Sequence, residues 1–316
     1  MVNKQKKNRM KRVAFLLFLV LSGFFMAEAQ EKTAAYERYW KPDTRKIRVI
    51  SYNVFNGFDW GKDRDRQERF VAWIREQDAG VVAMQELCGF TQESLSALAK
   101  QWGHPYAVIV KENGYPVGIT SKSPIRVKNK ILKGCGHGLL HVEILGYDFL
   151  VTHLNPNNCE TRRQEAAYIA GYIRENGSSR CLLMGDMNSH SPADADYMEG
   201  HATDLRMQYG AESANLTDGR FDYSVVSCFL ALPLVDMCRE YVPAARRQTF
   251  PTPVLMNVSQ HPEVREKTGE RLDYILVTPE VAKQVVDAAV HKGEDTDYLS
   301  DHYPVSIDLL FQEKKE

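Results

Sequence analysis

Short apolar runs alternate with amphipathic segments along most of the chain. Helical spacing of apolar residues predicts helices at 64–77, 91–102 and 159–174, with Thr91 able to cap the second. Segment 189–270 is less regular, with an apolar stretch at 225–235 and a polar loop at 257–270. Apolar runs typical of strands, separated by glycine, proline and asparagine, occur at 47–54, 80–84, 106–110, 117–120, 125–132, 139–145, 147–152, 181–184, 272–277 and 303–310.

Many short strands with a few interspersed helices predict an α/β fold. In such a fold, sheets pack on each other and helices cover their outer faces. The chain shows no internal repeat, low-complexity block or linker. We therefore predict a single domain at 47–312, preceded by an extended polar segment at 30–46.

The first 29 residues have the pattern of a signal peptide. A basic stretch is followed by the apolar run Val13–Phe25, and Ala27-Glu28-Ala29 is a small-x-small cleavage site. The apolar run is shorter than the ~20 residues that a membrane-spanning helix needs. The pattern predicts an exported protein, periplasmic or secreted, with Gln30 at its mature N-terminus and no stable membrane span.

Removal of this peptide changes the charge of the chain. The full 316 residues carry a net charge of −1, and the mature chain, with 34 basic and 40 acidic side chains, carries −6. A mildly acidic protein has no general attraction to nucleic acid, although a local basic groove stays open. The six cysteines form no CxxC motif, and the sequence leaves their pairing open. We expect a monomer.

Polar residues recur where apolar runs end or begin. Each alone also has an ordinary structural role, such as a turn or a cap, but their recurrence favours one shared site. Carboxylates and amides without a cysteine or histidine cluster favour a hard cation, Mg²⁺ or alternatively Mn²⁺. HExxH, Walker and Gly-x-Ser-x-Gly motifs are absent from the sequence. The polar residues at the strand ends fit metal-assisted attack of water on a phosphate ester. They are Asn53, Glu86, His153, Asp186, Asn188, Asp273, Asp301 and His302.

Six ordered motifs resemble those of the endonuclease/exonuclease/phosphatase superfamily. The resemblance spans about residues 47–310 and implies a four-layer α/β sandwich, in which two mixed, mostly antiparallel sheets lie between helices. It does not select one member of this group of nucleases, sphingomyelinases and phosphatases. The motifs are Ile50-Ser51-Tyr52-Asn53-Val54, Met84-Gln85-Glu86, Thr152-His153-Leu154, Gly185-Asp186-Met187-Asn188, Arg271-Leu272-Asp273-Tyr274-Ile275 and Ser300-Asp301-His302.

The resemblance also implies residue roles. Glu86 would be the main metal ligand, with Asn53 and Asp301 beside the metal and the phosphate. Two further residues, Asn155 and Arg162, are candidates for binding substrate. Their ordinary alternatives are a turn around Pro156 and a solvated charge at the start of a helix.

The remaining motif residues would carry the chemistry. His302 would contact the phosphate or act as the general base, and Asp273 would hold its ring. Asp186 would orient or deprotonate the attacking water, so the identity of the base stays open between Asp186 and His302. Asn188 and His153 would stabilise negative charge on the phosphate oxygens.

The sequence thus supports three hypotheses. The first is an exported Mg²⁺-dependent phosphoesterase that acts on a phosphodiester or a phosphomonoester of unidentified structure. The second is a secreted nuclease acting on DNA or RNA. The third is a non-catalytic binding protein on the same scaffold, because fold alone does not determine function.

Overall fold

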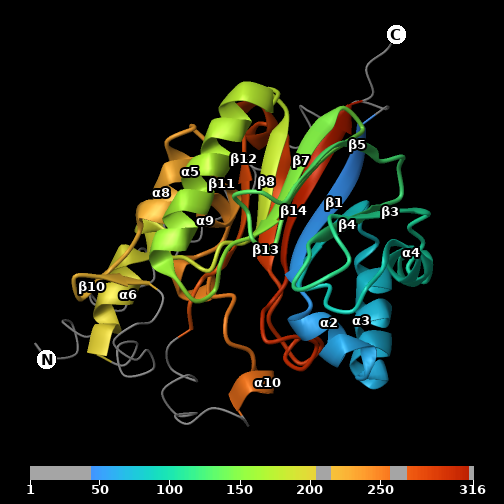
Figure 1. Cartoon of the computed structure of the whole chain (residues 1–316), viewed down its shortest axis with the longest axis horizontal. Coiled ribbons are helices and arrows are strands. Elements are labelled where there is room, and N and C mark those ends of the chain that lie inside the picture. Colours follow the sequence, from blue (N-terminus) through green and yellow to red (C-terminus); the bar gives the residue numbers. More distant parts are fainter. Residues whose placement is uncertain (1–43, 204–214, 257–268, 313–316) are drawn as a thin grey trace, which may run out of the picture. The chain divides into compact units, whose positions relative to one another are not determined.

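Two six-stranded sheets form the framework of the fold in Figure 1. The computed structural model describes residues 44–203, 215–256 and 269–312, and Lys46–Leu310 form one compact unit. The first sheet has the strand order β13-β14-β1-β2-β4-β3, and the second has the order β11-β12-β8-β7-β6-β5. Their strands are β1 (Thr44–Asn53), β2 (Val81–Gln85), β3 (Tyr106–Ile109), β4 (Gly118–Ser121), β5 (Arg126–Ile131), β6 (Leu139–Ile144), β7 (Tyr147–His153), β8 (Cys181–Asp186), β11 (Val235–Asp236), β12 (Asp273–Val277), β13 (Val285–Val290) and β14 (Val305–Gln312).

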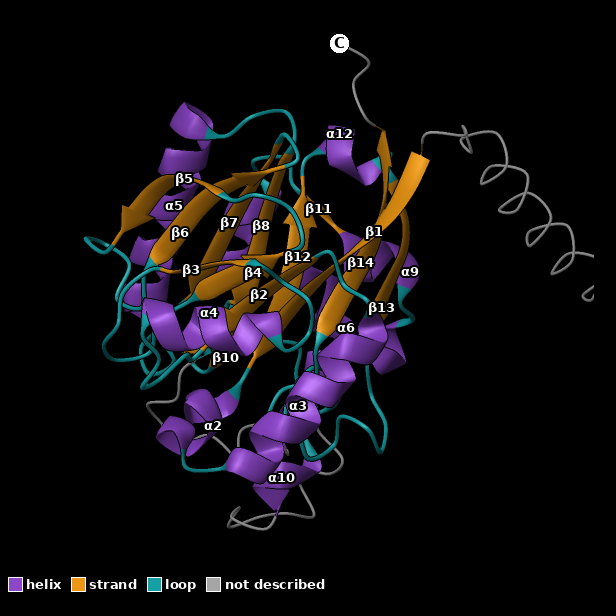
Figure 2. Cartoon of the chain, turned by 90° about the vertical axis from the view of Figure 1, so that its right-hand side faces the viewer, coloured by secondary structure: helices purple, strands orange, loops and turns teal. Residues whose placement is uncertain are grey.

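Helices cover the outer face of each sheet. Phe70, Trp73 and Ile74 of α3 share a hydrophobic core with the first sheet, and Ile169 of α5 and Phe229 of α8 share one with the second. Figures 1 and 2 show these helices on opposite sides of the two sheets. The helices are α2 (Phe55–Gly61), α3 (Arg64–Gln77), α4 (Gln92–Lys100), α5 (Cys159–Asn176), α6 (Ala195–Gly200), α8 (Ser224–Leu230), α9 (Met237–Tyr241), α10 (Pro253–Met256) and α12 (Pro279–Ala282).

Smaller elements complete the described residues. A two-stranded ribbon joins β9 (Leu216–Thr217) to β10 (Arg220–Phe221), and 3-10 turns η1 and η2 occupy Pro192–Asp194 and Ala244–Arg246. The layered arrangement confirms the α/β sandwich of two mixed sheets flanked by helices that the sequence predicted.

Local sequence signals account for where the first two long helices begin and which face they bury. The Asp63 side chain accepts a hydrogen bond from the backbone N–H of Arg66 and begins α3 at the predicted residue. Thr91 and Ser94 form a reciprocal capping box at α4, which confirms the predicted cap. Buried Phe70, Trp73 and Ile74 lie on one face of α3, as their spacing predicted.

Two parallel strand pairs bring polar residues to one edge of each sheet. β1 pairs parallel to β2, and β7 pairs parallel to β8. Because parallel strands share a direction, their carboxyl ends meet at the same edge. β12 runs antiparallel to β8, so the start of β12 lies at that edge too. This edge is where the polar motif residues gather.

Several elements were not predicted. The apolar stretch at 225–235 contains α8, and edge strand β13 has no counterpart among the predicted strands. Segment 55–61, assigned as α2, is a left-handed turn in which Phe55 to Trp60 all have positive φ, between +49° and +59°. A left-handed conformation costs non-glycine residues about 1–2 kcal/mol each, so surrounding contacts must hold this turn.

Some predictions fall outside the described residues. These are the signal peptide at 1–29, nearly all of the extended segment at 30–46, and most of the polar loop at 257–270. All six cysteines are free thiols in the structure. Among the described helices, none combines the length and the apolar character required to cross a bilayer.

Candidate active site

Three side chains of the second sheet lie at neighbouring register positions. His153 ends β7 and is paired with Asp186 at the end of β8, and Asp186 is in turn paired with Asp273 at the start of β12. All three are almost fully buried. The strand pairing therefore places a histidine and two carboxylates side by side, although more than 100 residues separate the first from the last in the sequence.

Asn53 joins this row to the first sheet. Its Nδ2 donates to Glu86 Oε1 at 3.2 Å and to Asp186 Oδ2 at 3.0 Å. Its Oδ1 accepts from the backbone N–H of Phe55 at 3.0 Å, which fixes the orientation of the amide. In this geometry Asn53 holds the carboxylates of both sheets together. Its predicted role as a metal ligand stays a prediction.

Glu86 lies just beyond β2 and is half-buried. Its Oε2 accepts from the backbone N–H of Asn56 at 2.8 Å, so the left-handed turn is anchored on this carboxylate. Glu86 itself has a positive φ of 59°. Strained backbone persists only where other contacts maintain it, and it is often found at functional sites.

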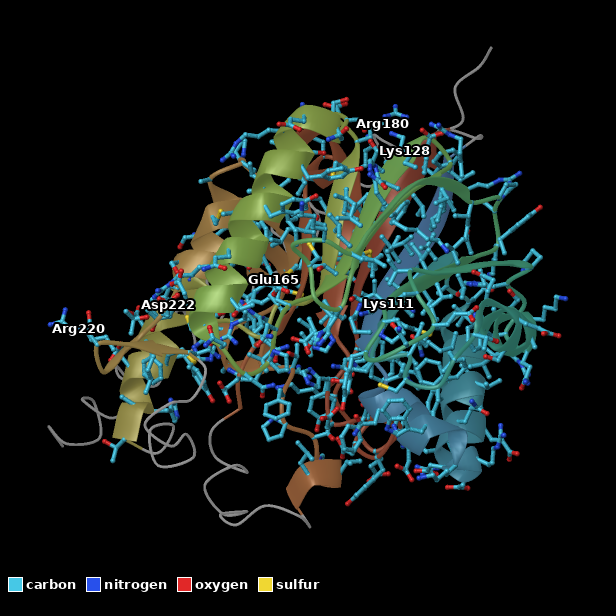
Figure 3. The ribbon with its side chains drawn as sticks, viewed as in Figure 1. Lys111, Lys128, Glu165, Arg180, Arg220 and Asp222 are labelled. Atoms are coloured by element: carbon cyan, nitrogen blue, oxygen red, sulfur yellow. The ribbon has the colours of Figure 1, made fainter. Side chains whose placement is uncertain are left out.

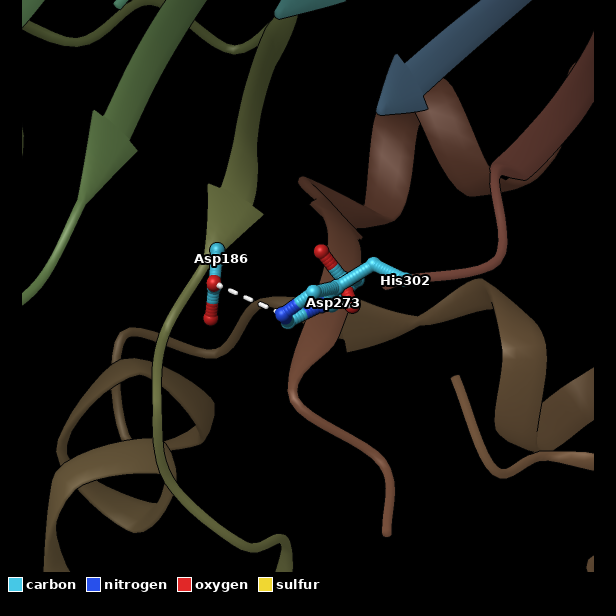
Figure 4. A group of neighbouring side chains, drawn as sticks. All are labelled: Asp186, Asp273 and His302. Carbon is cyan, nitrogen blue, oxygen red and sulfur yellow. Dashed lines mark hydrogen bonds and ion pairs between the residues drawn. The ribbon is translucent and has the colours of Figure 1, made fainter. Parts of the chain in front are cut away.

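Asp186 is the centre of the site. Its Oδ2 lies 3.5 Å from His153 Nε2 and 3.7 Å from His302 Nε2, in addition to its bond from Asn53. Its Oδ1 accepts from the backbone N–H of Asn188 at 2.8 Å. Figure 4 shows Asp186, His302 and Asp273 facing one another from separate segments of the chain. Asp186 is therefore held between two histidines at the meeting point of the sheets.

His302 and Asp273 form a hydrogen-bonded pair. His302 Nδ1 lies 2.8 Å from Asp273 Oδ2. Burial lowers the pKa of His302, but the carboxylates of Asp273, Asp186 and Asp301 together raise its pKa well above the ordinary value. By contrast, burial lowers the pKa of His153 to about 4, despite the neighbouring Asp186. The site thus pairs an imidazolium with a neutral imidazole.

The carboxylates of Asp301, Glu86 and Asp186 lie close enough to repel one another. Burial raises the pKa of Asp301 to about 7, the charge of His302 lowers it, and the charges of Glu86 and Asp186 raise it further. The Ser300 hydroxyl donates to Asp301 Oδ1 at 3.3 Å. A divalent cation would relieve this repulsion, and an all-oxygen donor set suits a hard cation such as Mg²⁺. The residues present therefore fit a metal ion beside Glu86 and Asp301.

A second grouping of metal-type ligands is Asp186, Asp273 and His302, whose ligand atoms lie within 4.8 Å of one another. His302 Nδ1 is engaged by Asp273, and the raised pKa of His302 disfavours the free lone pair that a metal requires.

The two residues predicted to bind substrate have different settings. Asn155 is partly exposed, and its Oδ1 accepts from the backbone N–H groups of Asn157 and Asn158, each at 2.9 Å. Arg162 is fully buried, not solvated. Its guanidinium donates to Asn155 O at 2.7 Å, Asn215 Oδ1 at 2.9 Å and Ser189 Oγ at 3.0 Å. These bonds favour a positioning role for Arg162, which ties together the loops after β7 and β8.

Asn188 lies in the second of those loops, with φ of +46°. Its Nδ2 donates to Leu154 O at 3.0 Å, so the side chain bridges the ends of β7 and β8. Its predicted role toward phosphate oxygens stays a prediction.

Sequence reasoning missed residues that support the site. Thr249 Oγ1 accepts from the backbone N–H groups of Leu272 and Asp273 at 3.0 and 3.2 Å, and the ring of Phe250 lies 4.9 Å from that of His302. Both belong to the irregular segment, where no periodic pattern marks them. His137 was also missed, and its ring lies 4.5 Å from that of His153.

The sequence of this chain matches a known protein family. The sequence model of the Endonuclease/Exonuclease/phosphatase family matches residues 50–302, most of the chain. The chain belongs to the Endonuclease/Exonuclease/phosphatase family. This confirms the resemblance drawn from the six motifs. No curated protein gives a significant sequence match.

Solved structures of the family share the fold. An AP endonuclease from Archaeoglobus fulgidus matches with a TM-score of 0.64 at 21% identity, covering 83% of this chain and 99% of that one. The 3′ phosphatase NExo from Neisseria, bound to a product DNA hairpin, matches with 0.63 at 19% identity and the same coverage. The 3′-5′ exonuclease NExo from Neisseria meningitidis matches with 0.62 at 18% identity, again covering 83% and 99%.

The family assignment establishes the class of reaction. The chain is a metal-dependent hydrolase of phosphate ester bonds. A non-catalytic binding protein on this scaffold is therefore set aside.

Proposed function

We propose that the chain is an exported, Mg²⁺-dependent phosphoesterase that directs a water molecule onto a phosphodiester or phosphomonoester. The observation that carries this proposal is the arrangement around Asp186, which contacts Asn53, His153 and His302 at once. Glu86 and Asp301 would hold the Mg²⁺ ion, which would supply Lewis-acid stabilisation of charge on the phosphate.

The chain's own residues suggest a division of labour. The protonated state favoured for His302 has no lone pair with which to accept a proton, so we assign the base role to Asp186. His302 then stabilises the negative charge that develops on the phosphate, and Asp273 keeps its ring oriented. Neutral His153 and Asn188 contribute hydrogen bonds to the same oxygens.

Hydrolysis by the processed chain from Gln30 tests the proposal. We expect Mg²⁺-dependent release of 4-nitrophenol from a nitrophenyl phosphodiester or monoester, and loss of release in EDTA. Glu86→Gln, Asp186→Asn and His302→Ala should each lower kcat/KM by at least about 10²-fold. Glu93→Gln, an exposed carboxylate on α4, is the matched control and should leave the rate unchanged. Activity that persists without metal would contradict the proposal.

Action on nucleic acid is the second candidate. The structural neighbours include a 3′ phosphatase bound to a DNA hairpin, whereas the charge of −6 on the mature chain argues against broad affinity for polyanions. A panel of single-stranded and duplex DNA, RNA, sugar phosphates, inositol phosphates and choline phospholipids separates the candidates. A rate on DNA that exceeds all others and falls steeply with salt would favour the nuclease.

Export rests on the N-terminal sequence pattern. Expression of the full chain in a Gram-negative host should yield a periplasmic or secreted protein that begins at Gln30. Mass spectrometry of the intact product measures this directly, and a cytosolic product that retains residues 1–29 would contradict it.

A further inference from the structure

A row of aromatic rings leads away from the site. Ring centroids lie 4.5 Å apart between His153 and His137, 5.6 Å between His137 and Tyr115, and 6.2 Å between Tyr115 and Trp60. Exposure increases along this row, from 2% at His153 to 37% at Tyr115 and 48% at Trp60. We refer to Trp60, Tyr115 and His137 as the aromatic strip. It runs from His153 at the site to solvent-exposed Trp60.

The loop that carries His137 is fixed in place. The backbone N–H of Gly136 donates to Glu165 Oε1 at 2.9 Å, and Lys111 Nζ donates to the Gly136 carbonyl at 2.7 Å. The other oxygen of Glu165 accepts from the backbone N–H of Asn155 at 2.8 Å, two residues beyond His153. Figure 3 labels Glu165 and Lys111, which come from separate segments of the chain. One buried carboxylate thus sets the spacing between the loops of both histidines.

The strip presents rings more than charges. Burial lowers the pKa of His137 to about 3, so its ring is neutral, and the ammonium group of Lys111 is directed to a backbone carbonyl. Such a surface offers little to a second phosphate group but offers π-faces and edges to another ring. Trp60 also lines a hollow of about 340 Å³ together with Arg64 and Phe90, and neither Tyr115 nor His137 lines it.

We propose that the aromatic strip is a subsite for a planar ring carried on the group esterified to the phosphate, such as an aryl group or a nucleobase. This inference rests on the proposed function, because it requires the phosphate to bind beside His153. Trp60 and His137 would act as specificity-determining residues. They would contact the substrate without taking part in the bond cleavage.

Two phosphonates test this subsite without hydrolysis. Phenylphosphonate and methylphosphonate carry the same phosphoryl group and no cleavable ester, so their affinities differ only through the ring. Calorimetric titration in Mg²⁺ should give a dissociation constant about tenfold lower for phenylphosphonate, the scale of one stacking contact. His137→Ala should narrow the difference between the two constants, with the larger loss of affinity for phenylphosphonate.

Controls separate binding from folding. Trp60→Phe should keep the preference, and Tyr106→Ala, which removes an exposed ring from β3, should not alter it. Equal binding of both phosphonates by the unaltered protein would overturn the subsite alone. An equal loss of affinity for both in His137→Ala would overturn it too, because that residue would then only support His153. Failure of the protein to bind either phosphonate would overturn the proposed phosphoesterase function as well.

Discussion

The backbone conformation of Gly185 determines where the neighbouring Asp186, the proposed base, is placed. It lies one residue before Asp186 in β8, with φ of +142°, and pairs with Thr152 of β7. A Cβ placed there would lie 1.9 Å from the Thr152 carbonyl oxygen, where contacts under 3.0 Å are essentially never seen. β7 and β8 would have to separate by about 1 Å. Because the next pair in their register is His153 with Asp186, this separation would displace both of those side chains.

Gly185→Ala should therefore reduce both stability and rate. A side chain in this region of φ costs about 1–3 kcal/mol before the collision is counted, so we expect a loss of at least about 3 kcal/mol in unfolding free energy. A displacement of about 1 Å at reacting groups costs on the order of 10²-fold in rate. Urea denaturation followed by circular dichroism, together with kcat on a nitrophenyl ester, measures both.

Gly171→Ala is the matched control. Gly171 lies inside α5 with no atom near the position of an added Cβ, and alanine favours helix over glycine by about 1 kcal/mol. This variant should be slightly more stable and fully active. The reasoning would be refuted if Gly185→Ala unfolded at the wild-type urea concentration and kept the wild-type rate.

Three further predictions address the groups around the site and in the core. Arg162→Met leaves two buried acceptors and the partly exposed Asn155 carbonyl unpaired and should lower the unfolding free energy by about 3 kcal/mol. Arg162→Lys should not restore it, because one ammonium cannot reach all three acceptors; chemical denaturation checks both. Asp273→Asn should lower kcat by at least about 10²-fold and should also lower Tm, because it removes the carboxylate that pairs with buried His302, whereas the exposed control Asp287→Asn should alter neither. Burial lowers the pKa of His104 to about 4, so the folded chain binds fewer protons than the unfolded chain between pH 6.5 and 4. Lowering the pH through this window should therefore remove about 3 kcal/mol of unfolding free energy. The His104→Gln variant, measured over the same pH series, should not show this loss.

The site could be predicted from the sequence because each of its motifs ends or begins a strand. Strand pairing then brings the motif residues together, as the register His153–Asp186–Asp273 shows. The orientation of Asn53 could not be predicted in this way. Its amide oxygen accepts from the backbone N–H of Phe55, a bond that depends on a left-handed turn in which only two of the seven residues are glycine.

Burial was the other quantity that the sequence did not reveal. Arg162 near the start of a helix resembles a solvated charge, and its acceptors come from positions 155, 189 and 215, far apart along the chain. Thr249 and Phe250 support Asp273 and His302 from a segment without periodicity. Such contacts are set by tertiary structure, which a single sequence pattern does not encode.

The position of β1 affects how the chain can fold during synthesis. β1 lies between β2 and β14 in the first sheet, and of the described strands β14 is synthesised last. The interior of that sheet therefore stays incomplete until nearly the whole chain has been made, and such long-range pairing is slow. For the same reason, a product that ends before residue 305 would leave β1 with an unpaired, apolar edge and a tendency to aggregate.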